Sequence, residues 1–190
     1  AIIARTVLEG VGGYRAGSVH AVRRGSEHGL SGHGMPNELG IPASACGPPT
    51  RHGGVIRRPN LVKRFLDGVD SPLVMVAAPA GYGKSTAVTL WSDDDERRFA
   101  WVRLEALDDD PVHLLRHIAA SLDHVVGVEA ELIRVLTGPG RSFDTAQLPA
   151  LGQHLSMCGD LVLVIDDVHL LSTDTSRAVF MGLLSYLGEG

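Results

Sequence analysis

Cysteine is scarce in this sequence of 190 residues, which contains only Cys46 and Cys158. The two lie more than a hundred positions apart, so their spacing indicates neither a CxxC metal motif nor a disulfide framework. Such cysteine usage is typical of a reducing compartment, and we therefore predict a cytoplasmic location.

Long apolar runs are also missing. No stretch reaches the roughly 18 apolar residues that indicate a transmembrane helix. The short apolar start of the chain is broken at Arg5 and lacks the apolar centre of a secretory signal. We therefore expect no membrane span and no contact with a membrane.

Positive charge is in short supply over most of the chain. Residues 61–190 contain ten Lys/Arg against nineteen Asp/Glu, whereas residues 1–60 contain seven against three. An acidic domain is a poor electrostatic match to the phosphates of DNA. If the protein acts on DNA, we expect the contact surface to lie outside this stretch.

The first quarter of the chain is rich in residues that disfavour regular structure. Residues 1–54 contain twelve Gly and four Pro with no sustained apolar period, and segments such as Ser31–Gly34 are typical of coil. We predict that residues 1–54 form a disordered, low-complexity leader and that residues 55–190 form the ordered domain.

Beyond the leader, apolar runs of strand length alternate with helical patterns. Strands are predicted at 72–78, 99–104 and 161–165, and helices at 60–67, 83–91, 111–126, 129–137, 145–157 and 175–187. This alternation predicts an α/β domain with a parallel sheet.

The strongest chemical motif is the segment Ala78–Thr86, which matches the phosphate-loop pattern G-x-x-x-x-G-K-[ST] except that Ala78 replaces the first glycine. Lys84 is expected to reach the β- and γ-phosphates of a nucleotide, and the Ser85 hydroxyl to bind Mg²⁺. The alternative is a glycine turn with an incidental Gly-Lys-Ser. The residues expected to surround the phosphates are Pro79, Ala80, Gly81, Tyr82, Gly83, Lys84, Ser85 and Thr86.

A second motif places two carboxylates after the apolar strand 161–165. Asp166 and Asp167 would lie at the carboxyl edge of the sheet, where ligands bind in open α/β folds. We predict that Asp166 holds Mg²⁺ through its water shell and that Asp167 is the catalytic residue that orients or activates water. Acids that merely start a turn are the alternative, and the phosphate loop upstream makes that less attractive.

The histidines offer little for a metal site. His113 and His117 share a helical face, but His124 lies nearly two turns further on, so no third ligand joins them. His169, just after the paired acids, is placed where it could contact a terminal phosphate, although a plain loop histidine explains it equally well.

Four segments, in this order, resemble the ATPase domain of large LuxR-type transcriptional regulators similar to the maltose-regulon activator, a branch of the signal-transducing ATPases with numerous domains (STAND). They are Arg58-Pro-Asn-Leu61, then Pro79–Thr86 followed by Trp91, then Phe99–Pro111, then Val164–Leu170. The resemblance spans about residues 57–187.

The resemblance implies a three-layer P-loop NTPase fold, Mg²⁺ and ATP as ligands, Arg58 near the adenine, and slow ATP hydrolysis that resets a conformational switch. It also implies that DNA is bound only through C-terminal parts absent from this chain, and that the intact protein can self-associate. The domain would be incomplete. In this class, the strand that follows the Asp166 strand along the chain lies between that strand and the phosphate-loop strand. We expect that following strand to be absent here, which would leave a gap in the sheet with unpaired backbone groups.

Two other functions fit parts of the pattern. A small-molecule kinase or other P-loop phosphotransferase would use the same loop but needs a lid with basic residues, and only Arg177 follows the paired acids. A degenerate scaffold that binds no nucleotide is disfavoured by the intact Lys84, Ser85 and Asp166.

Overall fold

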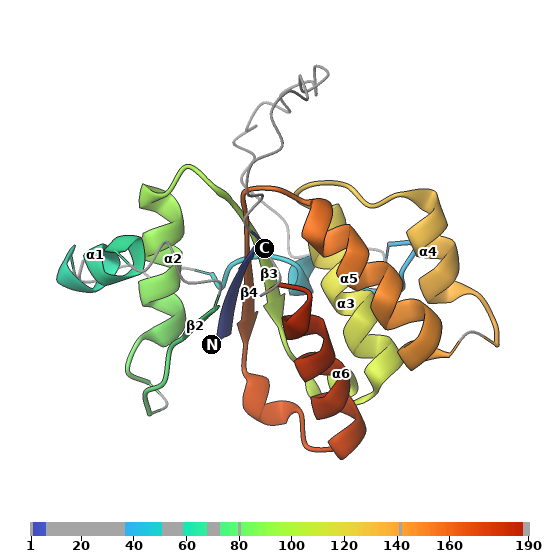
Figure 1. The fold of residues 1–190 in the computed structure, drawn as a ribbon. Coiled ribbons are helices and arrows are strands. Elements are labelled where there is room, and N and C mark those ends of the chain that lie inside the picture. Colours follow the sequence, from blue (N-terminus) through green and yellow to red (C-terminus); the bar gives the residue numbers. More distant parts are fainter. Residues whose placement is uncertain are drawn as a thin grey trace, which may run out of the picture.

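The computed structural model describes residues 2–6, 37–50, 59–67, 73–79, 81–140 and 142–187. A four-stranded sheet stands between two groups of helices, with α1 and α2 on one face and α3, α4, α5 and α6 on the other (Figure 1). The prediction of the α/β class is confirmed.

The strands are β1 (Ile2–Thr6), β2 (Leu73–Met75), β3 (Arg98–Arg103) and β4 (Leu161–Asp166). The helices are α1 (Pro59–Asp67), α2 (Lys84–Asp94), α3 (Pro111–Asp123), α4 (Ala130–Thr137), α5 (Leu148–Met157) and α6 (Asp174–Ser185). Short turns of helix complete the set: η1 (Ala43–Ala45), η2 (Ala106–Asp109), η3 (Phe143–Gln147) and η4 (Val168–Leu170). All predicted elements are present, although the strand expected at 72–78 is limited to β2.

The strand order is β2-β1-β4-β3, and the sheet is mixed. β3 and β4 run parallel, with Trp101 opposite Val164. β1 runs antiparallel to both of its neighbours, with Ile3 opposite Val74 on one side and Val164 on the other. The prediction of a wholly parallel sheet is therefore wrong at β1.

Two parts of the expected leader are structured. Residues 2–6 form β1, and residues 37–50 lie against the domain with Leu39, Ile41 and Ala45 buried in its core. For these two segments the prediction of disorder is wrong, while residues 7–36 and 51–54 lie outside the described residues.

β1 also occupies the position between β2 and β4 where we expected a gap. The facing edges of two strands offer rows of N–H and C=O groups, and any extended segment can pair with them. The β-branched residues Ile2, Ile3 and Thr6 favour that extended conformation.

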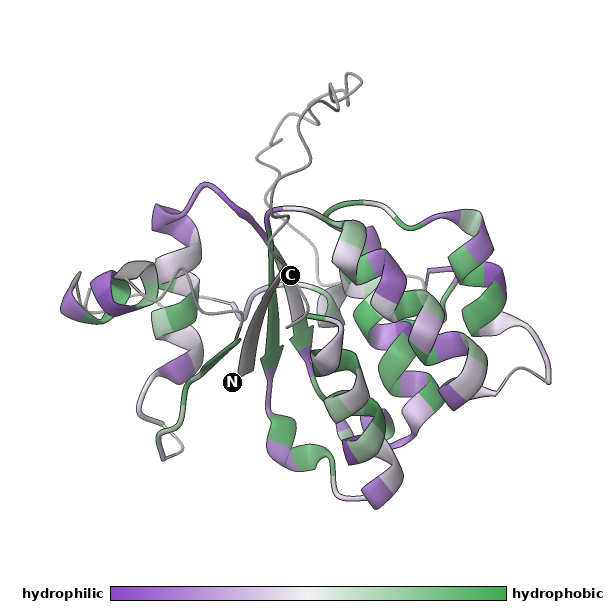
Figure 2. Ribbon diagram, in the orientation of Figure 1, coloured by the Kyte–Doolittle hydropathy of each residue, from purple (hydrophilic) through white to green (hydrophobic). Residues whose placement is uncertain are grey.

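The strand β4 separates two hydrophobic clusters, and all six of its residues are buried. Leu161, Leu163 and Ile165 pack with α3, α5 and α6, whereas Val162 and Val164 pack with the cluster formed by α1, α2 and β3. Figure 2 shows the hydrophobic colour continuing along β4. A strand buried on both faces is what its uninterrupted apolar run predicts.

The buried ring of His117, a residue of α3, contacts both Asp108 and the segment 37–50. The Asp108 carboxylate is fully buried, and His117 Nδ1 lies 3.0 Å from both of its oxygens. The other ring nitrogen of His117 lies 3.3 Å from the carbonyl oxygen of Ala45. The Glu105 amide donates to the same carboxylate at 2.7 Å, and His113 Nδ1 lies at 2.9 Å.

The position of β1 predicts that the domain depends on it. Ile3→Pro removes one N–H from a strand paired on both sides, so a carbonyl in β2 or β4 loses its donor and we expect a loss of about 1–3 kcal/mol in unfolding free energy. Urea unfolding measures this change in unfolding free energy. Ile3→Ala keeps the amide and serves as control; equal stability of the proline and alanine variants would contradict the pairing.

The Asp108 cluster predicts an acid-sensitive contribution to stability. Burial acts to raise the pKa of Asp108, but hydrogen bonds from His117, Glu105 and His113 and the charge of His117 outweigh it and lower the pKa. A lowered folded-state pKa gives stability that is present above the unfolded value near ~3.9 and is lost as the pH falls through the folded value.

Asp108→Asn should therefore cost about 3 kcal/mol at neutral pH, because it leaves a buried pair incomplete. The difference from wild type should shrink below about pH 4. Denaturation at pH 7 and pH 3 measures both values. A difference that stays constant down to pH 3 would show that the charge of Asp108 is not its source.

Candidate functional site

The glycine-rich segment after β2 turns through two left-handed residues before α2 begins. Gly81 has a φ of 80° and Gly83 a φ of 76°, a conformation that residues with a Cβ rarely adopt. A Cβ at Gly81 would meet no atom within 4 Å, and one at Gly83 only the Thr86 Cβ at 3.9 Å. Glycine is thus favoured at these two positions because the backbone is left-handed, and not because a Cβ would collide with a neighbouring atom.

The Lys84 side chain turns back over this loop. Its Nζ donates to the carbonyl of Ala78 at 2.7 Å and lies 3.2 Å from that of Pro79. Lys84 is the first residue of α2, so its ammonium lies beside the helix N-terminus, where backbone N–H groups also lack helical partners. Positive charge and free donors therefore meet at one point.

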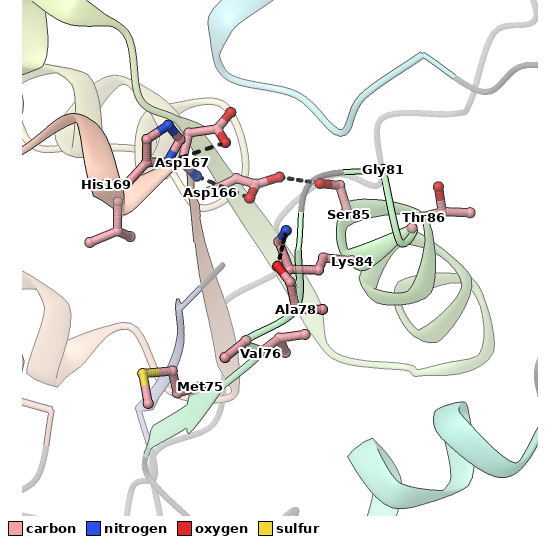
Figure 3. Close-up of a pocket in the computed structure, with 13 residues that line it drawn as sticks. Met75, Val76, Ala78, Gly81, Lys84, Ser85, Thr86, Asp166, Asp167 and His169 are labelled. Atoms are coloured by element: carbon pink, nitrogen blue, oxygen red, sulfur yellow. Dashed lines mark hydrogen bonds and ion pairs between the residues drawn. The ribbon is translucent and has the colours of Figure 1, made fainter.

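The two sequence motifs are in direct contact. Ser85 Oγ donates a hydrogen bond to Asp166 Oδ2, although the residues are 81 positions apart in the chain (Figure 3). The other carboxylate oxygen of Asp166 accepts from the amide of Asp167 at 3.0 Å. Asp166 is only 7% exposed, so its carboxylate is held in a fixed place at the end of β4.

Asp167 has an unusual backbone. With φ 56° and ψ 34° it is left-handed, and it is the one non-glycine residue with positive φ in the described part of the chain. This conformation costs roughly 1–2 kcal/mol for most L-residues and less for Asp and Asn. Its side chain is half exposed, and its Oδ1 lies 3.8 Å from His169 Nδ1. Such strain is concentrated at functional sites.

These groups surround one cavity of about 900 Å³ at the carboxyl ends of β2 and β4. Figure 3 shows the side chains of Ser85 and Asp166 directed toward one another, with the Lys84 ammonium against the carbonyl of Ala78. The lining residues are Met75, Val76, Ala77, Ala78, Gly81, Gly83, Lys84, Ser85, Thr86, Asp166, Asp167, Val168 and His169.

Some predicted site residues lie elsewhere. Tyr82 is 66% exposed and does not line the cavity, and neither does Pro79, whose carbonyl lies near Lys84. Arg58 and Ala80 lie outside the described residues.

Sequence reasoning missed the apolar part of the cavity wall. Met75, Val76, Ala77 and Val168 line it because they leave the sheet at the same edge as the motifs. Their signal is adjacency in the sequence: Met75, Val76 and Ala77 directly precede the phosphate-loop motif, and Val168 directly follows Asp167.

The helical histidines do not form a metal site. His113 and His117 converge on Asp108, and His124 is exposed. Across the described ranges, no three His, Cys, Asp or Glu side chains are grouped so as to hold a metal ion. Nor does that part of the chain contain a helix with the length and apolarity to cross a membrane.

Comparison with known proteins finds distant relatives. No family model and no solved structure matches the chain. The HTH-type transcriptional regulator MalT of Yersinia enterocolitica is 31% identical over 155 residues, which are 78% of this chain. MalT of Yersinia pestis is 27% identical over 146 residues, or 74% of the chain.

The serine/threonine-protein kinase PknK of Mycobacterium tuberculosis is 28% identical over 180 residues, or 92% of the chain. The chain spans only 16% of the length of each of these relatives. It is therefore distantly related to one segment shared by much longer proteins named as MalT regulators and PknK kinases.

Proposed function

We propose that this chain is the ATP-binding switch module of a LuxR-type transcriptional regulator, and that its domain is a three-layer P-loop NTPase. The observation that carries the proposal is the hydrogen bond from Ser85 to Asp166, because it joins the glycine-rich loop to the paired acids at one cavity. That edge of an open α/β sheet is where ligands bind.

The donor set fits a nucleotide with a divalent cation. The backbone amides of the loop and of the first turn of α2 favour phosphate oxygens, and Lys84 would exchange the carbonyl of Ala78 for the β- and γ-phosphates. The Ser85 hydroxyl and the Asp166 carboxylate are hard oxygen ligands of the kind that Mg²⁺ prefers. Mg²⁺ would neutralise charge on the phosphates.

Asp167 suits the role of water-orienting residue. Its half-exposed carboxylate faces the same cavity and is held at a fixed angle by its left-handed backbone. His169 lies on the same wall, where it would face the terminal phosphate. One half-exposed carboxylate as the water-orienting group fits slow hydrolysis, which suits a switch better than a high-turnover enzyme.

The regulator role draws on the relatives. Two of the proteins named above are HTH-type transcriptional regulators, and each is about six times as long as the aligned segment. The acidic balance of residues 61–190 makes direct DNA binding by this segment unfavourable. Other parts of a longer protein would contact the DNA. We expect that longer protein to be cytoplasmic and able to self-associate.

A phosphotransferase is the second candidate, since one relative is named as a protein kinase. Phosphate transfer between substrates needs basic groups that close over the phosphates. Arg177 is the single basic residue after the paired acids apart from His169, and its Nε donates to the carbonyl of Leu171 at 2.9 Å. Because this guanidinium is engaged within the fold, the switch is the better supported function.

Lys84→Ala should weaken Mg²⁺-dependent binding of a fluorescent ATP analogue at least about 100-fold, since the phosphate charge loses its partner. Titration of the wild-type chain should be saturable, with ATP competing better than GTP. Lys63→Ala removes an exposed lysine on α1 and serves as the matched control. Equal affinity of the Lys84 and Lys63 variants would refute the site.

Asp167→Asn should leave binding of the analogue intact and slow ATP hydrolysis by about 100-fold or more, because general base assistance is lost. Asparagine tolerates the left-handed backbone, so this change isolates the charge, whereas Asp167→Ala also adds strain. Phosphate release under single-turnover conditions measures the rate. Parallel losses of binding and hydrolysis would overturn the role given to Asp167.

A further inference from the structure

One carboxylate outside the cavity holds the loop that follows β4. Asp109, the last residue of η2, accepts hydrogen bonds from the amides of Ser172 at 2.8 Å and Thr173 at 3.0 Å. It also accepts from the hydroxyls of Ser172, of Ser176 at 2.7 Å and of Thr173 at 3.2 Å. Five donors from a segment more than sixty positions away therefore converge on one side chain.

These bonds fix the far end of the loop that carries Asp167. Its near end is fixed by the sheet, where the Leu104 amide donates to the carbonyl of Asp166 at 3.2 Å. Both anchors come from the same stretch of chain, the end of β3 and η2. The segment 167–171 is thus held at both ends by one neighbouring structure.

Between the two anchors the loop is a single tight turn. The Leu170 amide donates to the carbonyl of Asp167 at 2.9 Å, and the Leu171 amide to that of Val168 at 3.1 Å. Leu171 is buried in the core. Such a compact turn has little room to absorb a displacement at Ser172, so a shift there would move the left-handed Asp167.

The hydrogen bonds that Asp109 accepts from Ser172, Thr173 and Ser176, here called the clamp, are not needed to cap α6. Thr173 is the N-cap of α6, and its own hydroxyl accepts from the Ser176 amide at 3.1 Å. A serine or threonine cap of this kind satisfies the helix start without an outside acceptor. The carboxylate of Asp109 is therefore additional to what the helix requires. The hydrogen bonds from Ser172, Thr173 and Ser176 keep the pKa of Asp109 well below its usual range, so the clamp is charged at neutral pH.

We propose that Asp109 is a positioning residue for the proposed ATP hydrolysis: by clamping Ser172 and Thr173 to η2, it holds Asp167 at the angle needed to orient water. This inference rests on the proposed function. Catalysis is sensitive to such placement, because a shift of about 1 Å in a catalytic group can cost on the order of 100-fold in rate.

The test compares Asp109→Ala with Asp110→Ala. Asp110 is the adjacent, exposed acid; it caps α3 by accepting from the His113 amide at 2.8 Å and makes none of the bonds to the loop. The two variants lose a carboxylate of the same kind one residue apart. For each chain we would measure amide hydrogen exchange across 167–176, affinity for the fluorescent ATP analogue, and single-turnover hydrolysis.

In Asp109→Ala we expect exchange at Asp167, Leu170 and Leu171 to speed up about 10-fold or more, because the turn loses its anchor. The rate of hydrolysis should fall about 10-fold or more, while the affinity for the ATP analogue changes less than about 3-fold. A loss of rate without a loss of affinity indicates that a catalytic group is no longer correctly positioned. Asp110→Ala should leave both the exchange of these amides and the hydrolysis rate near the wild-type values.

Faster exchange confined to residues 172–176, with hydrolysis no slower than in Asp110→Ala, would reduce Asp109 to a stabiliser of α6 and overturn the proposal. A wild-type chain that binds no nucleotide would refute the proposed function and with it the role in hydrolysis. In that case the exchange rates still decide separately whether Asp109 holds the loop.

Discussion

The buried strand β4 is the constraint on which the rest of the structure depends. Its side chains enter both hydrophobic clusters, so it cannot shift along its axis without breaking the packing on two faces. Asp166 is its last residue and is therefore placed as firmly as the core itself. The loop before α2 is brought to the same edge because α2 packs on one face of β4, and the hydrogen bond from Ser85 to Asp166 is the result.

Much of this arrangement could be predicted from the sequence, because its signals are local. The apolar run 161–165, Pro111 at the start of α3 and the glycine pattern before Lys84 each predict an element or a turn from adjacent residues. The placement of the paired acids at the carboxyl edge of the sheet follows from the rule that ligands bind at that edge in open α/β folds, and the loop that carries Ser85 lies at the same edge.

What could not be predicted depends on partners distant in sequence. The segment 2–6 lies in a stretch rich in glycine, and nothing near it indicates that two facing strand edges would accept it in an antiparallel direction. Likewise Asp108 and Asp109 belong to a run of three acids, a composition typical of a solvated loop, yet Asp108 is fully buried against His117 and Asp109 accepts hydrogen bonds from Ser172 and Thr173. A charged residue can be placed only when the donors around it are known.

The neighbouring acids Asp108, Asp109 and Asp110 illustrate how one short run can serve three parts of a fold. Asp108 ties η2 to α3 through His117, whose other ring nitrogen contacts Ala45; Asp109 ties η2 to the loop after β4, and Asp110 caps α3. Because Asp108 and Asp109 are neighbours in η2, a movement of the loop beside the cavity would have to displace η2, and with it the contact to α3, or break the hydrogen bonds from Ser172 and Thr173 to Asp109.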